Sequence, residues 1–168
     1  MPKIPASLKA SLLAVAIVGG GYQAMTPVVV EYVEGVEYYP YRDVGGVLTV
    51  CAGHTGADIV MRRYTPTECR VLLSRDLKPV YAAIERLVTV PLTDFQRTAL
   101  ATFVYNTGVG AFASSTLLKK LNAGDMNGAR DQMRRWVFAA GKRWKGLMTR
   151  REVEMAIFDV RGPHDLRN

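Results

Sequence analysis

The sequence has few of the residues that build metal sites. It contains two cysteines and two histidines among 168 residues, and neither cysteine belongs to a Cys-x-x-Cys pair. Zinc sites in proteins need three or four closely placed cysteine, histidine or carboxylate ligands. The composition therefore argues against a zinc site and predicts a protein that works without a metal or another cofactor.

The chain also lacks internal repeats, low-complexity tracts and flexible linkers, so everything after its first 30 residues is expected to form one folded unit. Its net charge is +7, which suits a polyanionic partner. No helix-turn-helix, zinc-finger or RNA-binding pattern accompanies that charge. An anionic cell wall or membrane surface is therefore the expected partner, and nucleic acid is not.

Charged residues are absent from residues 10–30, which follow Lys3 and Lys9. About 20 apolar residues span a bilayer, and a basic flank stays in the cytoplasm. The sequence thus predicts a membrane segment in residues 1–30 and an exported domain in residues 31–168. Gly19–Gly21 make the segment weakly hydrophobic, so its release from the bilayer is physically reasonable. A cleaved signal peptide is the alternative, but no clear small-x-small cleavage site is present.

The stretch from Glu34 to His54 holds the candidate chemistry. Hydrolysis of a glycosidic bond requires one protonated carboxyl and one ionised carboxylate. Glu34 follows an apolar run, where desolvation favours the protonated form, whereas Asp43 lies in a polar Gly-rich turn that favours the charged form. Glu34 is therefore the candidate acid and Asp43 the candidate base.

A β-hairpin is predicted around that turn. Residues 47–51 are β-branched and apolar, and residues 38–41 are their expected partner across Gly45–Gly46. This pairing brings Thr49 beside Asp43, where its hydroxyl can help to hold an attacking water, as an inverting reaction requires. Spacing alone leaves a simpler interpretation open, because acidic residues in Gly-rich turns often serve only as caps.

Helix signals dominate the rest of the chain. Thr65 and Thr93 each open a capping box, and Pro79 lies where it can kink or restart the first of these helices. The predicted fold is α+β and mainly helical: a small β-hairpin lobe, a connecting helix and a helical lobe with the cleft between them. Further helices are predicted to open at Ser114 or Ser115, to run from about Asp125 to Trp136, and to begin at Thr149.

Two other features have two interpretations each. Cys51 and Cys69 can form a disulfide if the domain is exported, and otherwise they are two buried thiols. Trp144 lies in a basic loop, Gly141–Gly146, and either stacks on a sugar ring or packs in the core.

Several motifs together resemble a known family. In order and spacing they are similar to the phage-type lysozymes, glycoside hydrolase family 24, and among these to lambdoid phage endolysins with an N-terminal signal-anchor-release segment. The resemblance covers nearly the whole chain beyond residue 30. Its motifs are Glu34-Gly35, Tyr41-Arg42-Asp43, Thr49-Val50-Cys51-Ala52-Gly53-His54, residues 103–108, residues 115–118, Arg135-Trp136 and residues 144–152.

The resemblance implies a two-lobed lysozyme-like fold and a muramidase that cleaves the β-1,4 bond between N-acetylmuramic acid and N-acetylglucosamine. It assigns catalysis to Glu34, Asp43 and Thr49, and it implies a structural ion pair between His54 and Asp76.

The family also places a polar residue along the sugar cleft at the position of Asn106. In this sequence Asn106 is therefore expected to contact substrate, with a helix cap as the alternative.

The same resemblance implies a location and a partner. The enzyme domain is expected in the periplasm, inactive while residues 10–30 hold it at the host inner membrane, and active on bacterial peptidoglycan after release, as a monomer that lyses the host. Two other functions stay open: a membrane-anchored protein that binds peptidoglycan without hydrolysis, and a lytic transglycosylase. The pairing of Asp43 with Thr49 argues against the second, because a transglycosylase uses no water.

Overall fold

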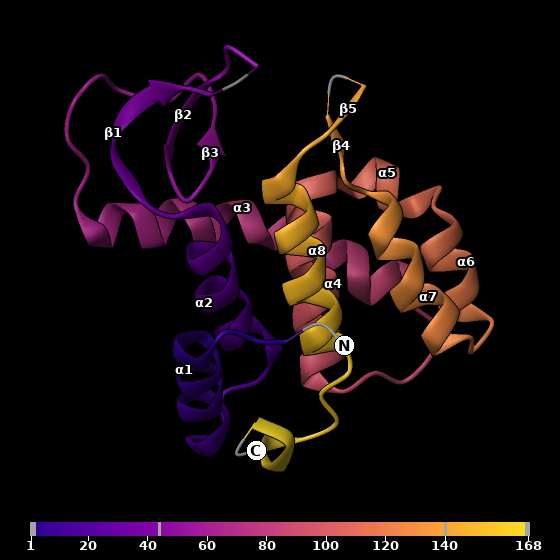
Figure 1. Cartoon of the computed structure of the whole chain (residues 1–168). Coiled ribbons are helices and arrows are strands. Elements are labelled where there is room, and N and C mark those ends of the chain that lie inside the picture. Colours follow the sequence, from indigo (N-terminus) through magenta and orange to yellow (C-terminus); the bar gives the residue numbers. More distant parts are fainter. Residues whose placement is uncertain (1–2, 44, 140, 167–168) are drawn as a thin grey trace.

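The computed structural model describes residues 3–43, 45–139 and 141–166. A small lobe containing three strands stands beside a larger helical lobe, and one long helix passes from the first to the second (Figure 1). The predicted fold class, α+β with a predominance of helix, is therefore confirmed.

The small lobe is built on an antiparallel sheet of three strands in the order β1-β2-β3. Strand β1 spans Glu37–Arg42, β2 spans Leu48–Cys51 and β3 spans His54–Thr55. Tyr41 pairs with Thr49 across the predicted hairpin, whereas β3 was not expected from the sequence. A disulfide joins Cys51, at the end of β2, to Cys69 in the following helix.

Helix α3, Pro66–Leu87, connects the lobes (Figure 1). Its capping box joins Thr65 and Glu68 as the sequence predicts, and the helix runs through Pro79 without a break. Helix α4, Asp94–Thr107, begins at a second capping box formed by Thr93 and Gln96. Seven consecutive residues of α4, from Thr98 to Val104, are buried, which makes this helix the centre of the helical lobe.

Short helices and one more hairpin surround α4. Helix α6 opens at Ser115, whose hydroxyl accepts from the Leu118 N–H. The remaining elements are α5 (Val109–Ala113), α6 (Thr116–Asn122), α7 (Met126–Gln132), a 3-10 turn η1 (Met133–Arg135), β4 (Phe138–Ala139), β5 (Lys142–Arg143), α8 (Lys145–Phe158) and a 3-10 turn η2 (Pro163–Leu166).

The predicted start of the last helix at Thr149 is wrong. Helix α8 begins at Lys145, and the residue in the extended N-cap conformation is Trp144, with φ −111° and ψ 127°. Thr149 lies inside the helix, where its side chain cannot cap the first turn. The basic loop around Trp144 is also more regular than expected, because Lys142–Arg143 form β5, which pairs with β4 just before the loop.

The uncharged N-terminal residues form two helices. Helix α1 spans Ala6–Ile17 and α2 spans Tyr22–Glu34, and the chain folds back between them at Gly19–Gly21. A Cβ atom on Gly20 would lie 2.5 Å from Val15 Cγ1 and 2.8 Å from the Val15 carbonyl oxygen, so this break depends on glycine. Within the described residues, none of the helices has the length and apolar character needed to cross a bilayer.

Both N-terminal helices contribute to the core of the helical lobe. Leu8 and Leu12 of α1 and Met25 and Val29 of α2 are almost completely buried in the cluster that includes Phe103 of α4. Helix α1 also contacts η2 near the other end of the chain (Figure 1). Since α2 crosses residue 30, the separation of an anchor in residues 1–30 from an enzyme domain stays a functional prediction.

We expect Leu12→Ala to lower the free energy of unfolding by about 2 to 5 kcal/mol, because it leaves a cavity in a close-packed core. The matched control is Val18→Ala at an exposed position, which should change it by less than about 0.5 kcal/mol. Chemical denaturation of released, soluble protein measures both values. Equal stability of the two variants would show that α1 does not stabilise the enzyme.

Candidate active site

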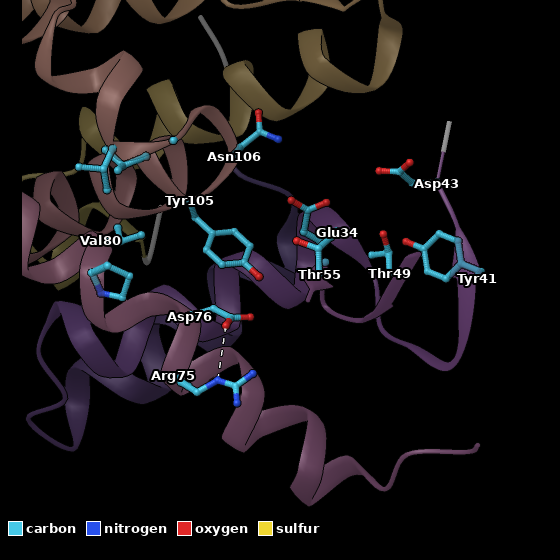
Figure 2. Close-up of a pocket in the computed structure, with 15 residues that line it drawn as sticks. Glu34, Tyr41, Asp43, Thr49, Thr55, Arg75, Asp76, Val80, Tyr105 and Asn106 are labelled. Carbon is cyan, nitrogen blue, oxygen red and sulfur yellow. Dashed lines mark ion pairs between the residues drawn. The ribbon is translucent and has the colours of Figure 1, made fainter. Parts of the chain in front are cut away.

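A cavity of about 600 Å³ opens between the two lobes. Figure 2 shows its polar side chains converging from the end of α2, from the small sheet and from helices α3 and α4. The predicted residues Glu34, Asp43, Thr49, Asp76 and Asn106 all line it, together with Tyr41, Thr55, Arg75, Pro79 and Tyr105 among others.

Glu34 is the last residue of α2, and Gly35 ends the helix with φ +73°. Its side chain is 27% exposed and forms an ion pair with Arg150 of α8, whose own side chain is 6% exposed. Sequence reasoning expected an apolar setting and missed this arginine. The only sequence signal was the Arg150-Arg151 pair within a family motif, and spacing does not reveal its partner.

Asp43 lies in the turn between β1 and β2. Its Oδ1 accepts hydrogen bonds of 2.8 Å from the N–H groups of Gly45 and Val47, which fix the orientation of the side chain in the turn. Arg42, expected near Asp43, instead donates to the carbonyl of Gly46 at 2.7 Å. The local turn therefore holds a carboxylate at the edge of the cavity, as the sequence predicts.

Thr49 projects from β2 toward the same cavity as Asp43 (Figure 2). Its hydroxyl donates to the Val47 carbonyl at 3.0 Å. Because that bond uses the single hydroxyl proton, the oxygen presents only its lone pairs to the cavity. Thr49 can therefore accept a hydrogen bond from a water beside Asp43.

Tyr105, on α4, joins the two lobes across the cavity. Its hydroxyl donates a hydrogen bond of 2.9 Å to the carbonyl of Ala52 in the small lobe. Burial raises the pKa of Tyr105, with smaller contributions from Asp76 and Glu34. Burial also raises the pKa of Tyr41, so both phenols stay protonated at neutral pH.

Gly53 allows the close approach of Tyr105 and Glu34. It has φ +89°, and a Cβ there would lie 3.7 Å from the Tyr105 hydroxyl and 3.8 Å from Glu34 Cδ. A side chain at this position would strain the backbone, although its Cβ would make only ordinary van der Waals contacts.

The structure pairs His54 with Asp76, at 2.7 Å between Nδ1 and Oδ2. His54 is 4% exposed, and its Nε2 lies 3.2 Å from Asp58 Oδ1. Arg75 in turn lies 2.7 Å from Asp58, and this contact, more than the one with His54, lowers the pKa of Asp58. Sequence reasoning missed Asp58 and Arg75, which extend the pair into a network bracing the small lobe on α3.

The two candidate substrate contacts differ in position. Asn106 lines the cavity, and its Oδ1 accepts a 2.8 Å hydrogen bond from Arg151 Nη2. Trp144 is outside the cavity lining and is 42% exposed, which does not fit the core alternative. In the described part of the chain, histidine, cysteine and acidic side chains form no group of three placed to hold a metal ion.

Residues 31–154 match the phage lysozyme family, and this match covers well over half of the chain. The chain belongs to that family. It is 68% identical over 170 residues to a protein of Escherichia phage Mu named SAR-endolysin, and the match covers 99% of each chain. It is 47% identical over 161 residues to a SAR-endolysin of Enterobacteria phage PA-2, and this match covers 92% of this chain and 96% of the other.

Among solved structures, a crystal structure of a P22 lysozyme mutant is similar with a TM-score of 0.68 and 29% identity. It covers 94% of this chain and 99% of that one. Membership in the family makes this phage lysozyme a glycoside hydrolase, in agreement with the enzyme class that the sequence predicts.

We expect His54→Ala to lower the free energy of unfolding by about 1 to 3 kcal/mol, because it leaves the partly buried Asp76 without its hydrogen-bond donor. Asp58→Ala removes only a half-exposed partner and should cost at most about 1 kcal/mol. Thermal and chemical unfolding of both variants would test this order. A His54→Ala protein as stable as the wild type would contradict a structural role.

Proposed function

We propose that this phage lysozyme is an endolysin whose cleavage of the β-1,4 bond between N-acetylmuramic acid and N-acetylglucosamine in peptidoglycan depends on Glu34, Asp43 and Thr49. The hydrolase activity and its use in host lysis follow from the family and the relatives. The observation that carries the residue assignment is one cavity to which Glu34 and Asp43 both present carboxyl groups, with the Thr49 hydroxyl facing the same space.

In the proposed reaction, protonated Glu34 donates its proton to the glycosidic oxygen as that bond breaks. A water held by Thr49 attacks the anomeric carbon from the opposite face and gives its proton to the Asp43 carboxylate. The products gain one water and the anomeric configuration inverts.

Arg150 orients this acid. The ion pair holds the Glu34 carboxyl group in a fixed direction, which favours a reactive geometry with the bound sugar. A sugar covering Glu34 excludes water and disfavours the charged form, so substrate binding promotes the protonated acid that the reaction requires.

We expect Glu34→Gln to reduce the rate of murein solubilisation by about 10²- to 10⁴-fold, because an amide cannot donate the proton. Glu37→Gln, on the exposed face of β1 and outside the cavity lining, should behave like the wild type. Mass analysis of the products then separates the alternatives. Reducing muropeptides indicate hydrolysis, anhydro sugars indicate a lytic transglycosylase, and binding without products indicates a non-hydrolytic protein.

We also propose that residues 10–30 lie in the host inner membrane before release, with the N-terminus in the cytoplasm and the rest in the periplasm. The uncharged stretch behind Lys3 and Lys9 supports this, as do relatives named SAR-endolysin. In that state Leu12 and Met25 face lipid and cannot fill the core that they occupy in the folded enzyme. The tethered form therefore lacks the support that places Glu34, and it is inactive.

Gly20→Leu is expected to keep the protein in the membrane fraction and abolish lysis, because it blocks the tight break at Val15 and makes the segment more apolar. Val18→Leu adds apolar surface at an exposed position without blocking the break and serves as the control. Fractionation of induced cells, with a murein assay of each fraction, measures both properties. Membrane-held protein that cuts murein as fast as released protein would refute the proposal. Sedimentation of the released form tests the expected monomer.

A further inference from the structure

One buried carboxylate connects two arginines, each of which contacts a residue that lines the cavity. Glu154 of α8 has no exposed surface. Its Oε1 accepts hydrogen bonds from Arg150 Nε at 3.1 Å and from Arg151 Nη2 at 3.0 Å, and its Oε2 lies 2.8 Å from Arg151 Nε. A single acidic side chain therefore fixes two consecutive guanidinium groups.

Each arginine extends from Glu154 to a different group in the cavity. Arg150 donates through Nη1 to Glu34, the last residue of α2. Arg151 donates through Nη2 to Asn106 Oδ1 on α4 at 2.8 Å. Glu154 on α8 is thus linked through the two arginines to α2 and to α4, which are distant from it in the sequence.

The chemistry of the arginine also fixes the orientation of the Asn106 amide. A guanidinium only donates hydrogen bonds, so the atom facing Arg151 must be the amide oxygen. The amide nitrogen, with two protons, is then left for a ligand in the cavity. Asn106 can therefore donate to an acceptor such as an N-acetyl carbonyl of the substrate.

Glu154 is also required for the balance of buried charge. Arg150 and Arg151 are adjacent and nearly inaccessible to water, and two buried cations without an anion are strongly unfavourable. Burial lowers the pKa of Arg151, and Glu154 opposes that change. Burial likewise raises the pKa of Glu154, while the two guanidinium groups stabilise its carboxylate.

We propose that Glu154 is a positioning residue that, through Arg150 and Arg151, sets both the charge balance at Glu34 and the orientation of the Asn106 amide. The inference rests on the proposed function. Glu154 touches neither substrate nor reacting atoms, and it acts only through the two arginines.

The effect on Glu34 has a definite sign. The ionisable groups around Glu34 include Arg150, Arg151 and Glu154 on α8, Tyr105 on α4 and Tyr41 on β1. Asp43, Arg75 and Asp76 line the same cavity. Replacing Glu154 by glutamine removes one negative charge from this set and leaves both cations. The increased positive potential favours ionised Glu34, so the protonated acid is lost at lower pH.

The test compares Glu154→Gln with Glu152→Gln, an exposed position on the same helix. Rates on soluble uncrosslinked glycan strands are measured across pH below the unfolding temperature of each variant. In Glu154→Gln, the pH at which activity falls on the alkaline side should decrease by about 0.5 to 1 unit, and KM should rise several-fold. The control should match the wild type in both. Glu154→Asp, which keeps the charge, should restore the alkaline limit.

An unmoved alkaline limit in folded Glu154→Gln would overturn the inference while the wild type still hydrolyses murein. An inactive wild type would instead refute the proposed function.

If the glutamine variant does not fold, Arg151→Lys provides an independent test, because it keeps the charge but loses the Nη2 hydrogen bond to Asn106. It should raise KM and shift the Asn106 side-chain amide signals in NMR spectra, with the alkaline limit unchanged. Unchanged KM and amide signals would also overturn the inference.

Discussion

The packing of α2 against α4 is the constraint on which the site depends. Helix α2 ends at Glu34, and its inner face is buried through Met25 and Val29 in the core that α4 organises. The position of the acid is therefore decided by apolar contacts about one and a half to two and a half turns before it on the same helix. Because α1 covers the same core, the least polar part of the chain supports its most polar site.

Buried charge provides the second level of organisation. Arg150, Arg151 and Glu154 are buried where an unpaired charge would be severely destabilising. Each of them therefore needs its partner in the folded helical lobe. In proteins generally, apolar side chains of similar volume often stabilise a core at least as well as buried ion pairs. The cost of ionic groups in the core is understandable because their outer ends hold Glu34 and Asn106 in fixed orientations.

Features that depend on residues close together in the chain could be predicted from the sequence. The capping boxes at Thr65 and Thr93 and the hairpin around Asp43 depend on neighbours within a few positions, and the structure has them. The start of α8 was misplaced because its N-cap residue makes no side-chain cap hydrogen bond and so carries no local signal. The contact of Arg150 with Glu34 joins residues 116 positions apart, which no spacing rule can reveal.

The break at Gly19–Gly21 also fixes a length. The helices on either side, of 12 and 13 residues, measure only about 18 and 20 Å at 1.5 Å per residue, whereas the hydrocarbon layer of a bilayer is about 30 Å thick. Residues 10–30, the uncharged part of this stretch, would measure about 32 Å as one continuous helix and would match that thickness. Passage between the two shapes requires new backbone hydrogen bonds only around three glycines. The uncharged segment can thus form two short helices or one long helix. The bend between the two short helices lies at Gly20, where a side chain cannot be accommodated.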